Sequence, residues 1–135
     1  MGQSSSYPIC TFQELQKLQN KKGDGEFILV NTLPLHRQDY LIQGTLPGIE
    51  ESKRINEYLH RNKHILIILY GLDCNDRSVL TKFAQLKTLG FSNVTVYRGG
   101  LFEWALLQEI YGCNFPTEGT IQDPLEVYKK MDKKN

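Results

Sequence analysis

Short apolar runs alternate along this chain with segments in which apolar residues recur at helical spacing. Two runs, Phe27–Val30 and Ile65–Tyr70, have no polar alternation, which is typical of parallel strands buried on both faces. A third run, Asn93–Tyr97, is also predicted as a strand, and Thr45–Ile49 is predicted as a short strand or a turn. Together these runs predict the strands of one sheet, with Ile65–Tyr70 at its centre.

Four segments before, between and after these runs have the pattern of helices. Thr11 and Glu14 have the spacing of a capping box, which predicts a helix start at Thr11 and an end near Gln19. Further helices are predicted over residues 51–61, 77–89 and 101–110, and Gly90 ends the second of these. Strands that alternate with helices predict an α/β fold with a mostly parallel central sheet and helices on both faces.

The chain has 135 residues, of which 40% are hydrophobic, so it is the size of one domain with a single core. We expect a flexible N-terminus over residues 1–10, a folded domain over residues 11–128 and a polar tail over residues 129–135. The formal net charge is only +1, which excludes the strongly positive field that nonspecific nucleic-acid binding needs.

The residues that most often bind metals form no cluster along the sequence. The three cysteines, Cys10, Cys74 and Cys113, are odd in number and widely spaced, which argues against a disulfide framework or a structural zinc site. The three histidines, His36, His60 and His64, lack metal-ligand spacing. We therefore predict no metal and no cofactor, and a reducing compartment such as the cytosol.

The N-terminus carries the best targeting motif of the chain. No apolar run approaches the roughly 20 residues needed to cross a bilayer, but Met1–Ser6 fits the pattern for myristoylation of Gly2, with Ser6 at the favoured hydroxyl position. The alternative is a polar N-terminus that merely begins with glycine. Because one myristoyl chain binds a membrane only marginally, a second element is needed. Candidates are palmitoylation of Cys10 and the lysine pairs at positions 21–22, 129–130 and 133–134.

Three short motifs in the right order resemble the rhodanese homology domain over nearly the whole chain, from about Thr11 to Ile110. Gly44-Thr45-Leu46-Pro47-Gly48 is similar to the family's Gly-His-Ile-Pro-Gly, and Gly99 to Trp104 is similar to its closing Gly-Gly-x-x-x-Trp. Leu89-Gly90-Phe91-Ser92-Asn93-Val94 is the third motif. The resemblance implies the rhodanese-like α/β fold.

The resemblance also implies a site, and the chain departs from the family there. In the family a cysteine follows the central strand and enters a loop of inward-pointing amides that stabilises a thiolate, a persulfide or an oxyanion. The matching position here is Gly71, which has no sulfur. The family's first-strand Asp-x-Arg is replaced by Asn31-Thr32-Leu33, which removes an ion pair. The loop is one residue longer than in the family's sulfurtransferases and resembles that of its phosphatases and arsenate reductases.

The candidate anion-binding loop consists of Gly71, Leu72, Asp73, Cys74, Asn75, Asp76 and Arg77. Cys74 is either a displaced nucleophile or a spectator thiol, and the two flanking carboxylates, Asp73 and Asp76, oppose formation of its thiolate. Arg77 either binds a small oxyanion or pairs with one of these carboxylates.

Two hypotheses follow. The first is a catalytically inactive rhodanese-like binding or regulatory module at a cytosolic membrane surface, attached through myristoyl-Gly2, with an unidentified protein partner. The second is a sulfurtransferase or thiol-dependent phosphatase that uses Cys74 with Arg77. The sequence names neither substrate nor partner.

Overall fold

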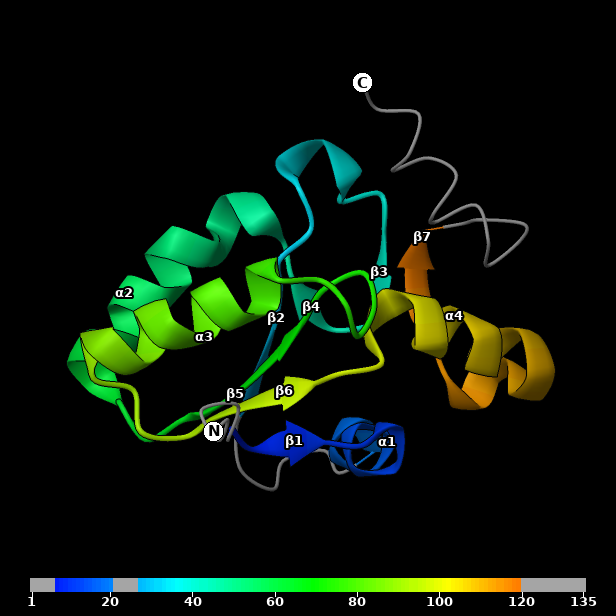
Figure 1. The fold of residues 1–135 in the computed structure, drawn as a ribbon, viewed down its shortest axis with the longest axis horizontal. Helices are drawn as coiled ribbons and strands as arrows, with labels where there is room; N and C mark the ends of the chain where they lie inside the picture. Colours follow the sequence, from blue (N-terminus) through cyan, green and yellow to red (C-terminus); the bar gives the residue numbers. More distant parts are fainter. Residues whose placement is uncertain (1–6, 21–26, 120–135) are drawn as a thin grey trace.

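The computed structural model of the protein describes residues 7–20 and 27–119 (Figure 1). A five-stranded parallel sheet forms its centre, with the strand order β1-β6-β5-β2-β4. Its strands are β1 (Ile9–Cys10), β2 (Phe27–Asn31), β4 (Thr45–Leu46), β5 (Leu66–Tyr70) and β6 (Val94–Tyr97). A separate two-stranded antiparallel sheet joins β3 (Tyr40–Ile42) to β7 (Thr117–Gly119).

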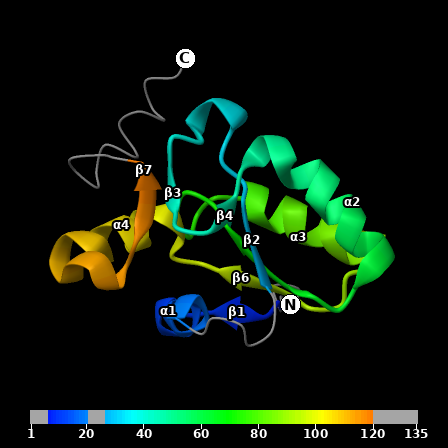
Figure 2. The ribbon, with the colours of Figure 1, turned by 180° about the vertical axis from the view of Figure 1, so that it is seen from behind.

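Helices cover both faces of the parallel sheet, as Figures 1 and 2 show from opposite sides. The four α-helices are α1 (Phe12–Asn20), α2 (Glu51–Arg61), α3 (Ser78–Leu89) and α4 (Gly100–Tyr111). Three short 3-10 helices, Leu35–Arg37, Gly48–Glu50 and Gly112–Asn114, lie in the connections. Helices α2 and α3 lie on one face of the sheet, and α1 and α4 lie on the other. The predicted α/β fold with a mostly parallel sheet is therefore confirmed.

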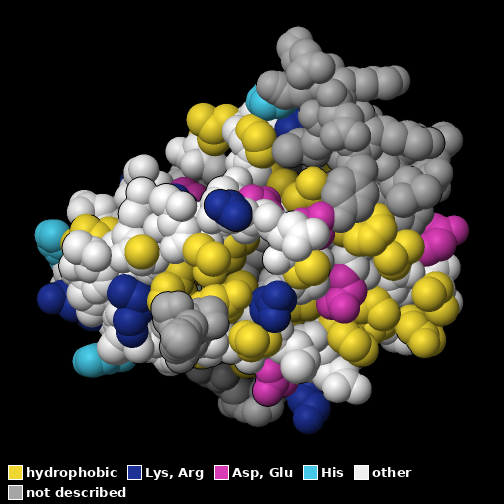
Figure 3. All heavy atoms as spheres, in the orientation of Figure 1, with side chains coloured by type: hydrophobic (Ala, Val, Ile, Leu, Met, Phe, Trp, Pro, Cys, Tyr) yellow, Lys and Arg dark blue, Asp and Glu magenta, His cyan; other side chains and the backbone are white. Residues whose placement is uncertain are grey.

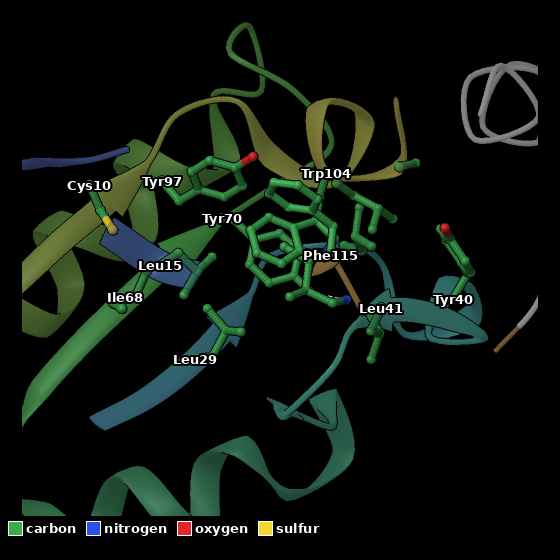
Figure 4. Close-up of a cluster of buried hydrophobic side chains, with 14 residues drawn as sticks. Cys10, Leu15, Leu29, Tyr40, Leu41, Ile68, Tyr70, Tyr97, Trp104 and Phe115 are labelled. Carbon is green, nitrogen blue, oxygen red and sulfur yellow. Dashed lines mark hydrogen bonds between the residues drawn. The ribbon is translucent and has the colours of Figure 1, made fainter. Parts of the chain in front are cut away.

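The strands send alternate side chains to two separate cores. On the face of α1 and α4, Leu29 and Ile68 pack with the fully buried Trp104 (Figure 4). On the face of α2 and α3, Ile67 and Leu69 pack among buried side chains of those helices. Because both faces are covered, every position of β5 from 67 to 70 is buried, which explains the continuous apolar run in its sequence.

The local signals for helix ends are confirmed by the hydrogen bonds. The Glu14 amide donates to Thr11 Oγ1 at 3.2 Å, and the Thr11 amide donates to Glu14 Oε1 at 2.9 Å, so the capping box is formed. Gly90 has φ +112° directly after α3, a left-handed conformation that favours glycine. Helix α2 has the predicted bounds, and α4 is one residue longer at each end than the predicted helix.

The structure also contains strands that the sequence pattern did not predict. Ile9 and Cys10 form β1 and pair with Val96 and Tyr97 of β6, so the N-terminal segment expected to be flexible contributes to the sheet at these two positions. Strands β3 and β7 pair across a large sequence separation, with Leu41 opposite Glu118. All three strands have two or three residues, too few for a periodic pattern.

Several predicted features lie outside the described residues. These are Gly2 with the myristoylation motif, the lysine pair at positions 21–22, and the polar tail over residues 129–135. Among the residues that the structure does describe, no helix is long and apolar enough to span a membrane.

Candidate functional site

The predicted anion-binding loop connects the end of β5 to the start of α3, at the carboxyl edge of the parallel sheet (Figure 1). Its first part is held by the N-terminus of α4. The Leu101 amide donates to the Gly71 carbonyl at 2.9 Å, and the Phe102 amide donates to the Leu72 carbonyl at 2.9 Å. Two amides of the first turn of α4, which have no partner inside the helix, are thereby satisfied. The loop backbone is thus fixed to a neighbouring helix.

This close contact explains the Gly-Gly pair that begins α4. Gly100 has φ +70°, and a Cβ atom added there would lie 2.7 Å from the Gly71 carbonyl oxygen and 2.9 Å from the Asp73 amide nitrogen. Both neighbours are backbone atoms, which cannot move aside as a flexible side chain can. The motif that resembles the family's Gly-Gly-x-x-x-Trp is therefore needed for helix α4 to approach the loop, whatever chemistry the loop performs.

The loop holds a carboxylate of the protein itself. Asp76 Oδ2 accepts a hydrogen bond from the Leu72 amide at 2.8 Å. The other oxygen, Oδ1, accepts from the Ser78 amide at 3.0 Å and from the Ser78 hydroxyl at 2.6 Å. The negative charge therefore sits between an amide at the start of the loop and the first amide of α3, where the helix dipole favours an anion.

Asp76 also occupies the space beside Gly71. A Cβ atom added to Gly71 would collide with Asp76 Oδ2, and it would lie 2.8 Å from Asp76 Cγ and 2.7 Å from Val79 Cγ2. Gly71 is itself buried. A side chain at position 71 and the observed position of the Asp76 carboxylate therefore exclude one another.

The remaining candidate residues lie at the surface of the loop. Cys74, Asn75 and Arg77 are exposed. Cys74 and Arg77 line a small cavity of about 60 Å³ together with Tyr7 and Tyr97. Asp73 accepts a hydrogen bond from the Asn75 amide at 2.9 Å through Oδ1, which tightens the turn around Cys74. The two acidic side chains of the loop thus bind loop amides.

Asn31, at the end of β2, takes part in a neutral amide pair where the family has a charged residue. Its side chain is 3% exposed, and its Nδ2 donates to Gln38 Oε1 at 3.0 Å while its Oδ1 accepts from Gln38 Nε2 at 2.9 Å. Gln38 Oε1 also accepts from the Gly48 amide at 3.0 Å. This reciprocal pair braces the loop after β2 without charge. Gln38 was not singled out from the sequence, because a single glutamine in a loop carries no recognisable pattern.

A buried hydroxyl pair joins β5 to β4, and both hydroxyls also bond to Ile42 of β3 in the small antiparallel sheet. The Tyr70 and Thr45 hydroxyls are 2.7 Å apart, and the Tyr70 oxygen accepts from the Ile42 amide at 3.2 Å. Burial raises the pKa of the Tyr70 phenol above its ordinary value, against the opposite effect of its hydrogen bonds to Thr45 and Ile42. Tyr70 therefore stays neutral and structural at physiological pH.

The seven candidate residues, at positions 71–77, thus lie in the loop between β5 and α3, with the Asp76 carboxylate bound to loop and helix amides and with Cys74 exposed. Within residues 7–20 and 27–119, no group of three or more His, Cys, Asp or Glu side chains is placed to hold a metal ion. The most informative residue is Asp76. The sequence shows that the charge of Asp76 opposes a thiolate at Cys74. It does not show that the Asp76 carboxylate turns toward the start of the loop and binds the Leu72 amide.

Comparisons with known proteins identify the fold by structure rather than by sequence. No protein-family model matches the chain, and no curated protein matches it. The rhodanese-like domain of the Alr3790 protein from Anabaena sp. superimposes with a TM-score of 0.59 and 24% identity, covering 86% of this chain and 82% of that one. A second structure of the Alr3790 protein gives a TM-score of 0.60 and 23% identity, covering 88% of this chain and 99% of that one.

A larger enzyme contains a region that superimposes on this chain equally well. The thiosulfate sulfurtransferase from Pseudomonas aeruginosa superimposes with a TM-score of 0.61 and 19% identity, covering 92% of this chain and 24% of that one. At these identities the likeness establishes the fold and leaves the activity open. The expected architecture is confirmed: this chain has the rhodanese-like fold.

Proposed function

We propose that the chain is a catalytically inactive rhodanese-like module that binds or regulates a partner at a cytosolic membrane surface. The observation that carries the proposal is the position of the Asp76 carboxylate, which fills the space where a side chain at position 71 would lie. With glycine there and the carboxylate hydrogen-bonded to the Leu72 amide, the loop has an anion of its own.

The charge of Asp76 also acts against the binding of anionic substrates in the loop. A thiolate, a persulfide or an oxyanion brought to the loop would compete with Asp76 for the same amides and would be repelled by its charge. Cys74 is exposed in a turn whose amide at Asn75 is already bonded to Asp73. Neither nucleophilic attack by Cys74 nor tight binding of a small oxyanion by Arg77 is favoured by this arrangement.

The membrane part of the proposal rests on the sequence at Gly2, which fits the pattern for N-myristoylation. The chain keeps the rhodanese-like fold but has an altered loop at positions 71–77. This combination suits a module that binds a partner at a membrane and does not transfer sulfur. The protein partner is then recognised by the surface of the module rather than by a reactive sulfur.

The test is sulfur transfer from thiosulfate to cyanide, together with hydrolysis of an aryl phosphate, by the wild type and by Cys74→Ser. Cys113→Ser is the matched control, because Cys113 is also exposed but lies outside the loop. We expect no activity above background from any of the three proteins. Activity of the wild type that Cys74→Ser abolishes and Cys113→Ser preserves would overturn the proposal and establish Cys74 as the nucleophile.

A further inference from the structure

We propose that the outer face of helix α4 is the docking surface of the chain's own C-terminal segment, residues 120–135, which lies outside the described residues. This contact is independent of the membrane attachment proposed above, and a protein partner that binds the same face has to displace the segment. The apolar surface of α4, the charges beside it and the place where β7 ends all support the contact.

Helix α4 carries apolar side chains on its outer face as well as on its inner one. The inner face packs into the core through the buried Leu101 and Trp104. The outer face carries Leu106, Ile110 and Tyr111, whose side chains are 37%, 68% and 59% exposed. A helix that is apolar all round is normally buried on all sides, so the outer face of α4 has the composition of a covered surface.

These exposed side chains belong to a wider apolar patch. The centroid of the Tyr111 ring lies 5.9 Å from that of Phe115, which follows the 3-10 helix Gly112–Asn114. Figure 3 shows hydrophobic side chains gathered at the end of the molecule where α4 lies, with acidic side chains among them. Contiguous apolar patches of this kind mark surfaces of interaction.

The charged side chains of α4 and β7 are all negative. Residues 99–119 include Glu103, Glu109 and Glu118 and no Lys, Arg or His. Glu109 and Glu118 are exposed. A symmetric contact between the same faces of two copies would bring these carboxylates together, and an anionic membrane would be repelled by them. The face therefore fits an occupant that is both apolar and basic.

The C-terminal segment has this composition. Residues 127–135 contain one acidic residue, Asp132, and four lysines, at positions 129, 130, 133 and 134. Three apolar side chains, Val127, Tyr128 and Met131, stand among these lysines. Apolar side chains with basic neighbours complement an apolar face with acidic neighbours.

The segment starts beside α4, because Gln108 of α4 is linked to both ends of β7. Gln108 Nε2 donates to Thr117 Oγ1 at 2.9 Å. At the other end of β7, Gly119 lies opposite Tyr40, whose hydroxyl donates to Gln108 Oε1 at 3.1 Å. Residues 120–135 can extend about 50 Å, whereas α4 is about 18 Å long. The lysines of the segment can therefore reach any part of the outer face.

The test is cross-linking of the full chain with a carbodiimide, which joins lysine amines directly to carboxylates in contact with them, followed by mass spectrometry of the peptides. The ion pair between Lys82 and Glu51 is the internal positive control. We expect the lysines of residues 127–135 to link to Glu109 about tenfold more often than to Glu57, an exposed carboxylate of α2. A mixture of unlabelled and isotopically labelled protein distinguishes links within one chain from links between two copies.

Substitutions on the outer face provide the matched comparison. Ile110→Ser/Tyr111→Ser should lower the yield of links to Glu109 roughly tenfold, because two apolar contacts are lost while every charge remains. Leu35→Ser/Ile49→Ser, at exposed apolar positions outside α4, should leave the yield unchanged.

Three results would overturn the docking of the segment. These are equal linking to Glu109 and Glu57, equal yields from the two double variants, and links that form only between two copies. None of them bears on the proposed function, because sulfur transfer by the wild type is assayed without reference to the outer face of α4. Preferential links within one chain that are lost in Ile110→Ser/Tyr111→Ser would establish the contact.

Discussion

The two edges of the parallel sheet differ in how their charges are satisfied. At the carboxyl edge, the Asp76 and Asp73 carboxylates bind amides of their own loop, and Gly100 allows α4 to close against that loop. At the amino edge, Lys63 and Lys87 extend from two short turns that contain no carboxylate. At the carboxyl edge the acidic side chains are thus bound by their own loop, whereas at the amino edge the two turns carry exposed lysines.

The scaffold around the loop is built without a side chain at position 71. The contacts that fix the loop, from Leu101 and Phe102 to the backbone of Gly71 and Leu72, do not depend on the side chain at position 71. A cysteine can therefore be lost there without loss of the scaffold.

Gly100→Ala should be the most damaging small substitution at the carboxyl edge. The added methyl group would meet two backbone groups at a positive φ, so we expect a loss of about 2–4 kcal/mol in the free energy of unfolding, measured by urea denaturation. Gly44→Ala is the matched control, because Gly44 has φ +89° but no atom within 4 Å of the added Cβ. Its loss should be only about 1 kcal/mol. Equal losses would show that the contact with the loop is unimportant.

The three cysteines should differ strongly in their reactivity. At pH 8, a thiol with a pKa of about 11 instead of 9.0 has about a hundredfold less thiolate, and burial further limits access to Cys10. Mass spectrometry after iodoacetamide treatment should find Cys74 and Cys113 modified and Cys10 intact. Rapid alkylation of Cys10 in the folded protein would show that its thiol is accessible and would keep it as a candidate for palmitoylation.

Asp76→Ala should destabilise the protein by about 1–2 kcal/mol, because the Leu72 and Ser78 amides lose their acceptor. Asp39→Ala provides the comparison. Asp39 is 56% exposed in a surface ion pair with Arg37, and its removal should cost at most about 0.5 kcal/mol. Thermal unfolding of both variants measures the difference, and a smaller effect at Asp76 than at Asp39 would contradict the internal role of its carboxylate.

Lys63→Gln/Lys87→Gln should change the free energy of unfolding by less than about 0.5 kcal/mol, because both side chains are exposed. The same urea titration used for Gly100→Ala provides this measurement. A large loss would mean that these two lysines at the amino edge of the sheet stabilise the fold.

Local signals were readable from the sequence because each depends on a few neighbouring residues. The capping box of Thr11 and Glu14 and the end of α3 at Gly90 are of this kind. The apolar run of β5 was readable because both of its faces are buried. In contrast, the pairing of β3 with β7 depends on residues more than 70 positions apart and on a hydroxyl from Tyr70.

The candidate site was only partly readable. The order of motifs located the loop and the glycine at its start, but the direction of the Asp76 side chain depends on the path of the loop backbone between Gly71 and Ser78. The amide pair of Asn31 with Gln38 needed the same three-dimensional information. Side-chain directions in irregular segments follow from packing, which periodicity does not encode.

In the structure, Asp76 occupies space that a nucleophile at position 71 requires. This occupancy is tested most directly by sulfur transfer from thiosulfate to cyanide in three variants that carry Gly71→Cys and Cys74→Ser. One keeps Asp76, and one adds Asp76→Asn, which has the same size without the charge. The third adds Asp76→Gly, which removes the carboxylate and leaves the Val79 methyl group as the contact that must shift. The account predicts transfer only with Asp76→Gly, and equal activity with Asp76 still in place would contradict it.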